Sequence, residues 1–163
     1  MTVFGKRLSE YAQFAKVFLV LIAVVGVTRL ALSLTGVPNS TAKWISVSGL
    51  MWIAVFYFAI RVHTRGFGTY KHLLPVLAIL NVTGQAIIIT GIAIAIFTGT
   101  DNIYSASEYA FGGDGKTWTH LGAHVLVGST VGTLVPWAFG CLIMLATRKL
   151  FKRETGTRAE VRA

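Results

Sequence analysis

Two histidines four positions apart, His120 and His124, are the residues of this sequence best suited to chemistry. Side chains at positions i and i+4 of a helix lie on one face about one turn apart, so both imidazoles can reach one metal ion. Asp114 precedes them and offers a carboxylate as a third ligand. The spacing therefore predicts a divalent metal site at His120, His124 and Asp114. The other interpretation, which we favour, is that both histidines hydrogen-bond a neighbouring loop.

Residues with little side-chain bulk continue the same spacing beyond the histidines, at Gly128, Gly132, Pro136 and Gly140. Within this series GSTVG is a GxxxG element, which allows another helix to approach closely. A haem ligated by His124 is the second interpretation, because a flat cofactor also needs glycine where it presses on a helix. The sequence thus predicts helix packing at Gly128, Gly132 and Gly140, with a haem site at His124 and Gly128 as the alternative.

Three further polar residues fall within apolar stretches, where a polar side chain needs a partner or a task. Asn81 and Gln85 are four positions apart and share a helix face. We interpret them as interhelical hydrogen-bonding groups, with a polar pathway or a quinone contact as the alternative. Arg29 either contacts a substrate or cofactor, or it extends toward the headgroups. There it can pair with one of three acidic residues, Asp101, Glu108 or Asp114.

The composition is that of a chain surrounded by lipid. Hydrophobic residues make up 54% of the 163 residues and charged residues 13%, about half of the roughly 25% charged residues in soluble domains. This composition excludes a soluble enzyme, a disordered tail and a fibrous repeat. The single cysteine excludes a disulfide framework and a cysteine-ligated zinc or iron–sulfur site.

Four apolar stretches are long enough to cross a bilayer, which requires about 20 helical residues. They cover approximately 14–34, 44–60, 73–97 and 120–146. Hydrocarbon tolerates no unpaired backbone group, so we predict helices throughout. Because the first two connections are short, consecutive helices should be antiparallel neighbours. The predicted fold is an all-α integral membrane protein, a single domain (1–147) with four transmembrane helices in an antiparallel up-down bundle.

Lysine and arginine set the expected orientation. Most of the 15 basic residues lie before the first span, between the second and third spans, or in a basic tail at 148–163. The positive-inside rule places these segments and both termini in the cytoplasm, and the loop 98–119 outside a bacterial-type inner membrane. The net charge of +9 then indicates contact with anionic headgroups, not with nucleic acid. We expect the outer loop to form a small interfacial cap because it is aromatic, with Tyr104, Tyr109, Phe111 and Trp118.

These patterns favour a non-catalytic protein over an enzyme. The sequence has no Gly-rich phosphate loop and no nucleophile motif, and its apolar spans contain no Asp or Glu. We expect a transmembrane subunit or scaffold of a larger membrane complex, with other membrane subunits or further copies of the chain as partners. The first alternative is a membrane redox protein that binds haem or a metal ion through His120 and His124 on the outer side. The second is an oligomeric transporter or channel.

Overall fold

The computed structural model describes residues 1–110 and 112–150, and within them the fold is almost entirely helical. Phe111 and the greater part of the predicted basic tail, 151–163, lie outside the described residues. The chain contains in order β1 (Thr2–Val3), β2 (Lys6–Arg7), α1 (Leu8–Leu34), α2 (Asn39–Ala42), α3 (Val47–Thr64), α4 (Tyr70–Thr98), the 3-10 turn η1 (Ser107–Tyr109), α5 (Trp118–Ala123), the π-helical turn η2 (His124–Gly128) and α6 (Ser129–Leu150).

Four helical spans of the described residues are long and apolar enough to cross a membrane: Leu8–Leu34, Asn39–Thr64, Tyr70–Thr98 and Trp118–Leu150. These spans correspond to the four predicted ones and extend beyond the apolar stretches from which they were predicted. The second span is interrupted, since residues 43–46 are not helical and its long helix α3 begins only at Val47. Polar residues continue the helices at their ends, where hydropathy alone gives no signal. The prediction of four apolar helices is confirmed.

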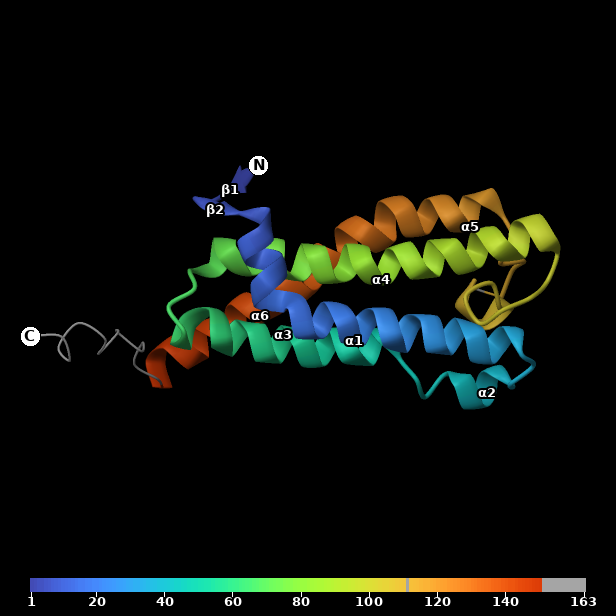
Figure 1. Ribbon diagram of the computed structural model, residues 1–163, viewed down its shortest axis with the longest axis horizontal. Coiled ribbons are helices and arrows are strands. Elements are labelled where there is room, and N and C mark those ends of the chain that lie inside the picture. Colours follow the sequence, from blue (N-terminus) through green and yellow to red (C-terminus); the bar gives the residue numbers. More distant parts are fainter. Residues whose placement is uncertain (111, 151–163) are drawn as a thin grey trace, which may run out of the picture.

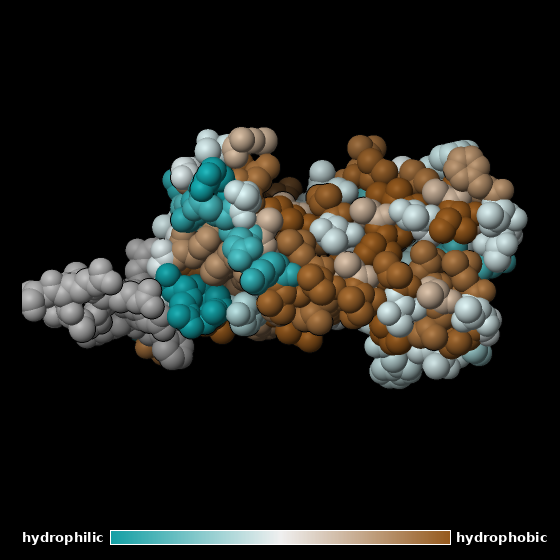
Figure 2. Space-filling model, in the orientation of Figure 1, coloured by the Kyte–Doolittle hydropathy of each residue, from teal (hydrophilic) through white to brown (hydrophobic). Residues whose placement is uncertain are grey.

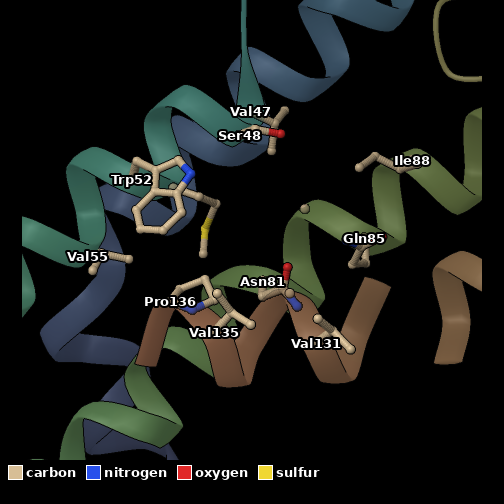
Figure 3. A pocket seen from close by; sticks show the side chains of 13 residues that line it. Val47, Ser48, Trp52, Val55, Asn81, Gln85, Ile88, Val131, Val135 and Pro136 are labelled. Atoms are coloured by element: carbon tan, nitrogen blue, oxygen red, sulfur yellow. The ribbon is translucent and has the colours of Figure 1, made fainter. Parts of the chain in front are cut away.

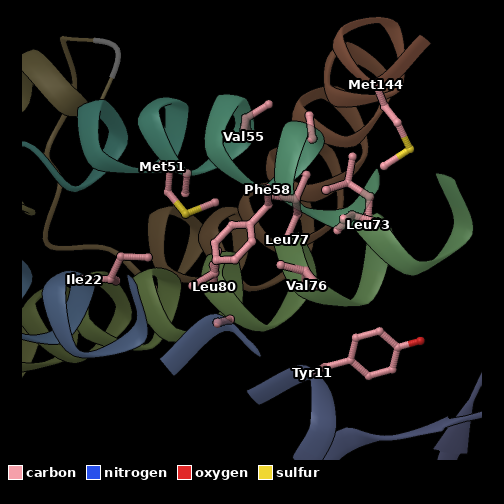
Figure 4. Close-up of a cluster of buried hydrophobic side chains, with 14 of the residues drawn as sticks. Tyr11, Ile22, Met51, Val55, Phe58, Leu73, Val76, Leu77, Leu80 and Met144 are labelled. Carbon is pink, nitrogen blue, oxygen red and sulfur yellow. The ribbon is translucent and has the colours of Figure 1, made fainter. Parts of the chain in front are cut away.

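The four long helices lie side by side, with α4 in contact with α1, α3 and α6 (Figure 1). Helix α3 also packs against α6 and, less extensively, against α1. The core contains side chains from all four helices, and Figure 4 shows Phe58 of α3 in their midst. Its largest fully buried members include Ile22, Phe58, Leu77, Leu80 and Met144.

A small β-hairpin precedes α1 and marks one end of the bundle, which we call the hairpin end (Figure 1). Strands β1 and β2 pair antiparallel through Phe4 and Gly5, whose φ angles of 51° and 82° are typical of a type I′ turn. The Tyr11 hydroxyl donates to the Val3 carbonyl at 2.9 Å. Figure 2 shows hydrophilic residues gathered at this end and hydrophobic residues over the middle of the molecule.

Residues 99–110 and 112–117, which we call the cap, fold onto the opposite end of the bundle. Asn102 Nδ2 donates to the Gly91 carbonyl at 2.7 Å, and the Tyr104 hydroxyl donates to the Gly26 carbonyl at 3.0 Å. Ile103 and Tyr104 are buried between α1 and α4. The cap is therefore held by the bundle itself, through side chains that reach carbonyls of two different helices.

The fourth span is not a uniform helix. It begins at Trp118 after Thr117, whose hydroxyl accepts from the His120 amide at 3.2 Å. The π-helical turn then adds one residue to the turn at 124–128, a feature often found near functional sites. Further along, Pro136 has no N–H to donate to the Gly132 carbonyl. Both irregularities lie on the segment that carries the predicted site residues.

Candidate functional site

The polar contact between α4 and α6 is centred on Asn81. Its Nδ2 lies 3.0 Å from the Gly128 carbonyl, 3.1 Å from the Ser129 carbonyl and 3.0 Å from Thr133 Oγ1. The Thr133 hydroxyl donates to Ser129 O at 2.8 Å, so it can only accept from Asn81. Three acceptors around one amide nitrogen fix the orientation of the side chain. The Asn81 Oδ1 is directed to the other side of the amide from Nδ2 (Figure 3), and a Cβ added at Gly132 would lie 3.2 Å from either atom.

One turn further along α4, Gln85 joins the same helix to His124. Gln85 Oε1 lies 2.9 Å from His124 Nδ1, and because an amide oxygen only accepts, Nδ1 carries the hydrogen. The Gln85 side chain also fills the space beside Gly128, where an added Cβ would lie 2.8 Å from Oε1. A flat cofactor pressed against Gly128 would have to displace this side chain. Gln85 thus occupies the space in which a haem held by His124 and Gly128 was predicted to lie.

His120 is bonded to the cap. Its Nδ1 lies 2.9 Å from the Gly115 carbonyl, and its ring is 5.0 Å from that of His124, centroid to centroid. Asp114 is directed elsewhere, since its Oδ1 accepts from the Lys116 amide at 2.8 Å. Among residues 1–110 and 112–150, no three His, Cys, Asp or Glu side chains are grouped so that they could hold a metal ion. The structure therefore does not bring His120, His124 and Asp114 together as one ligand set.

Gly132 and Gly140, the other two predicted packing glycines, also lie against neighbouring side chains. A Cβ added at Gly132 would lie 3.2 Å from the Asn81 amide, and one added at Gly140 would lie 2.8 Å from Leu73 Cδ2. Both neighbours belong to α4. The small residues of α6 thus face α4, where they leave room for side chains of that helix.

A cavity of about 330 Å³, which we call the middle chamber, lies beside the Asn81 contact between α3, α4 and α6 (Figure 3). Its walls are mainly apolar, and Ser48, Asn81 and Gln85 supply the polar groups. Trp52 on α3 and Val135 on α6 are 43% and 54% exposed, so the chamber opens sideways between these helices. The remaining lining residues are Val47, Met51, Val55, Gly84, Ile88, Val131, Gly132 and Pro136.

A second cavity of about 300 Å³, the cap-side chamber, continues toward the cap. The two chambers share Val47, Ser48 and Ile88 as lining residues, so they adjoin, and we call them together the cleft. The cap-side chamber carries both basic and aromatic groups. Its other lining residues are Arg29, Lys43, Ser46, Ile103, Tyr104, Tyr109 and His124.

Arg29 is the unusual member of this set, because it is a cation with only 8% of its surface exposed. The guanidinium carbon lies 5.5 Å from the ring centre of Tyr104 and 5.4 Å from that of Tyr109, within cation–π distance. Its Nε has no hydrogen-bond partner among the described residues. Asp101, an expected partner, is bonded to Lys116 instead, with Nζ and Oδ1 2.6 Å apart. Arg29 thus lies among aromatic rings, not beside a carboxylate.

Burial of Tyr104 raises the pKa of its hydroxyl, and the nearby charge of Arg29 opposes this shift as the smaller effect. The neutral hydroxyl is the form that donates to Gly26. In the same cap, the hydrogen bond to Asp101 is the main cause of a raised pKa of Lys116. Both groups therefore keep, over a wide pH range, the protonated form in which they hold the cap.

Comparison of the chain with protein-family models, with curated proteins and with solved structures finds no match. The site is accordingly defined by its own geometry. Sequence reasoning singled out Arg29, Asn81 and Gln85 but missed Lys43, Ser48 and Trp52, which form the opposite wall of the cleft. These residues carry no motif. Only their position could have indicated them. Lys43 directly precedes the second predicted span and Ser48 and Trp52 lie within it, and in an antiparallel pair of helices the start of this span lies beside the end of the first, where Arg29 is found.

Proposed function

We propose that this chain is a small, non-catalytic membrane protein that binds a lipid-soluble amphiphile in the cleft. The observation that carries the proposal is the middle chamber, an apolar space open between α3 and α6 with the amide of Asn81 among its lining groups. Binding sites for small molecules are typically apolar cavities of about 300–1000 Å³ with a few polar groups. The two adjoining chambers provide such a space along the bundle.

The proposed setting is a bilayer, crossed by the four spans as an antiparallel up-down bundle. Basic residues at the hairpin end, such as Lys6, Lys71 and Arg148, support a cytoplasmic position for that end in a bacterial-type inner membrane. In this setting the opening between α3 and α6 faces acyl chains and not water. An amphiphile would therefore enter sideways from the bilayer, with its polar head near the cap.

A variant that fills the junction of the two chambers tests this function. Ser48 is exposed and lines both chambers, so Ser48→Phe should block the cleft without disturbing the core. Thr90→Phe, at an exposed position of α4 away from the cleft, is the matched control. We expect the wild type and Thr90→Phe, purified in mild detergent, to release a near-stoichiometric amphiphile on solvent extraction, and Ser48→Phe to release none. Equal recovery from Ser48→Phe and Thr90→Phe would contradict the proposal.

A role as a transmembrane subunit or scaffold is the second candidate, and the uncovered helix faces support it. Only 11% of the apolar window of the fourth span is buried, compared with 39% of that of the second. Leu126, Leu134 and Leu142 lie on this exposed surface. A protein partner or a second copy would cover it without closing the cleft. Native mass spectrometry of the same preparation would then show a complex of fixed stoichiometry, whereas a bare monomer would contradict this role.

A further inference from the structure

The cap-side chamber contains a buried cation, Arg29, whose hydrogen-bonding groups the fold does not fully use. Arg29 is more than nine-tenths buried, lines the chamber, and has an Nε without a partner among the described residues. A buried charge is strongly unfavourable unless it is paired or hydrogen-bonded. The rings of Tyr104 and Tyr109 offset part of this penalty through their faces. They cannot accept the hydrogen bonds that the guanidinium has to give.

The charges around Arg29 are of one sign. Lys43 is a second cation on the chamber wall, and the lining residues include no carboxylate. The described acidic residues of the cap, Asp101, Glu108 and Asp114, line a different, exposed depression together with Lys116. An anion in the cap-side chamber would therefore meet two positive charges and no described negative one, and it could accept a hydrogen bond from the unpartnered Nε of Arg29.

The residues that line the two chambers also determine which kind of anion fits. Val47, Ser48 and Ile88 are shared with the middle chamber, which continues the space away from Arg29 along apolar side chains. A small hydrated anion would leave that apolar continuation empty. A molecule with an anionic head and an apolar tail would fill both, with its head at Arg29 and Lys43 and its tail beside Trp52. Building on the proposed function, we infer that the cleft selects amphiphiles with an anionic head of the phosphate type, and that Arg29 is the residue that recognises the head.

Trp52 provides the readout, because it lines the middle chamber and bromine quenches indole fluorescence on contact. The probes are dibrominated stearyl phosphate and dibrominated stearyl alcohol, which have the same tail, added to the protein in neutral detergent micelles. Subtracting the signal of Trp52→Phe isolates quenching at Trp52. We expect the phosphate to quench at a roughly tenfold lower mole fraction than the alcohol, the ratio that one charge-assisted hydrogen bond supplies.

Arg29→Gln should remove this preference, while Arg29→Lys should retain part of it because the charge remains. Arg61→Gln is the matched control, since Arg61 also has a buried, unpartnered Nε and lies 5.5 Å from the Tyr57 ring centre, but at the hairpin end of α3. It should leave the tenfold ratio unchanged. Lys43→Gln, at an exposed position, should reduce the ratio and provides a test that does not depend on a buried substitution.

The outcomes separate head recognition from cleft binding. If phosphate and alcohol quench Trp52 equally in the wild type, the cleft binds amphiphiles but head recognition by Arg29 is wrong. If neither probe quenches Trp52, both this inference and the proposed function fail. Displacement of the brominated phosphate by millimolar inorganic phosphate would show that a soluble anion is the ligand, which would overturn the assignment to an amphiphile.

Discussion

Individual polar side chains form hydrogen bonds between the helices of this bundle, and Asn81 is the clearest example. One amide nitrogen lies within 3.1 Å of three oxygen atoms of the fourth span, all of them from residues 128–133. In hydrocarbon no water can replace such a contact, although measured interhelical hydrogen bonds in membranes average only about 0.6 kcal/mol. Its value is therefore as much in orientation as in stability. The same contacts fix the orientation of an amide that lines the cleft.

Tyr104 gives a prediction at this scale that depends on pH. An unfolded tyrosine ionises near pH 10, whereas burial raises the pKa of Tyr104 above that value in the folded protein. The stabilisation is therefore complete below pH 10 and is lost as the pH rises through the higher folded pKa. Thermal unfolding should show a steeper decline above pH 10 for the wild type than for Tyr104→Phe. At neutral pH the variant should be less stable by about 0.5–1.5 kcal/mol, because it lacks the bond to Gly26. Parallel pH profiles of the two proteins would contradict this account.

The residue types alone identified the polar positions within the apolar stretches, but they did not identify the groups that those side chains contact. Asn81 and Gln85 were expected to form interhelical hydrogen bonds, and they contact α6 and His124. Arg29 has aromatic neighbours from a loop some 75 to 80 positions later in the chain, a separation that no local pattern encodes. The carboxylate expected for it is taken by Lys116, because these two residues belong to the same short cap.

At the scale of the elements, glycines of the fourth span leave room for side chains of α4. Gly128 of η2, and Gly132 and Gly140 of α6, each lie where a Cβ would contact a side chain of α4 at 3.2 Å or less. Gly122 of α5 is the counterexample, since nothing lies within 4 Å of an added Cβ there. The two kinds of glycine occur in one span and make a matched comparison possible.

Gly132→Leu should destabilise the protein, because its side chain would collide with the Asn81 amide. Overpacking of this kind typically costs about 1–3 kcal/mol. Gly122→Leu should leave stability within about 0.5 kcal/mol of the wild type, as surface substitutions usually do. Unfolding in mixed micelles of increasing dodecyl sulfate content measures both changes. Equal stabilities of the two variants would show that Gly132 does not face a tight contact.

The helical elements were largely predictable, because length and hydropathy determine a span almost independently of its neighbours. The β-hairpin and the π-helical turn were not. Two strands of two residues have no periodicity to detect, and the hairpin depends on contacts such as that between Phe4 O and His72 Nε2 at 3.1 Å. The π turn changes the register of a helix whose sequence reads as continuous. The cleft was not predicted either, since its lining residues belong to separate segments that come together only in the folded chain.

At the scale of the whole molecule, the distribution of charge predicts how the bundle sits in the membrane. The cap should be accessible from outside the cell and the hairpin end should not. In a background in which Ser replaces Cys141, Ser107→Cys in the cap should react with an impermeant thiol reagent on intact cells. Ser9→Cys, also at an exposed position but near the hairpin end, should react only after lysis. Ser105 is unsuitable for this purpose because it is only 3% exposed. The reverse labelling pattern would invert the proposed orientation.

The attachment of the cap has a consequence for the order in which the protein is assembled during synthesis. Tyr104 bonds to a carbonyl of α1 and Asn102 to one of α4, so the cap joins helices whose contact points lie some 65 residues apart in the chain. Helices in a membrane first insert individually and then associate. The cap segment emerges only after the third span, so α1 and α4 must meet before it can dock. In the proposed membrane setting, a nascent chain whose third span has just left the ribosome would therefore hold three helices that the cap does not yet join, and we expect it to be more open to protease at that stage than the complete protein.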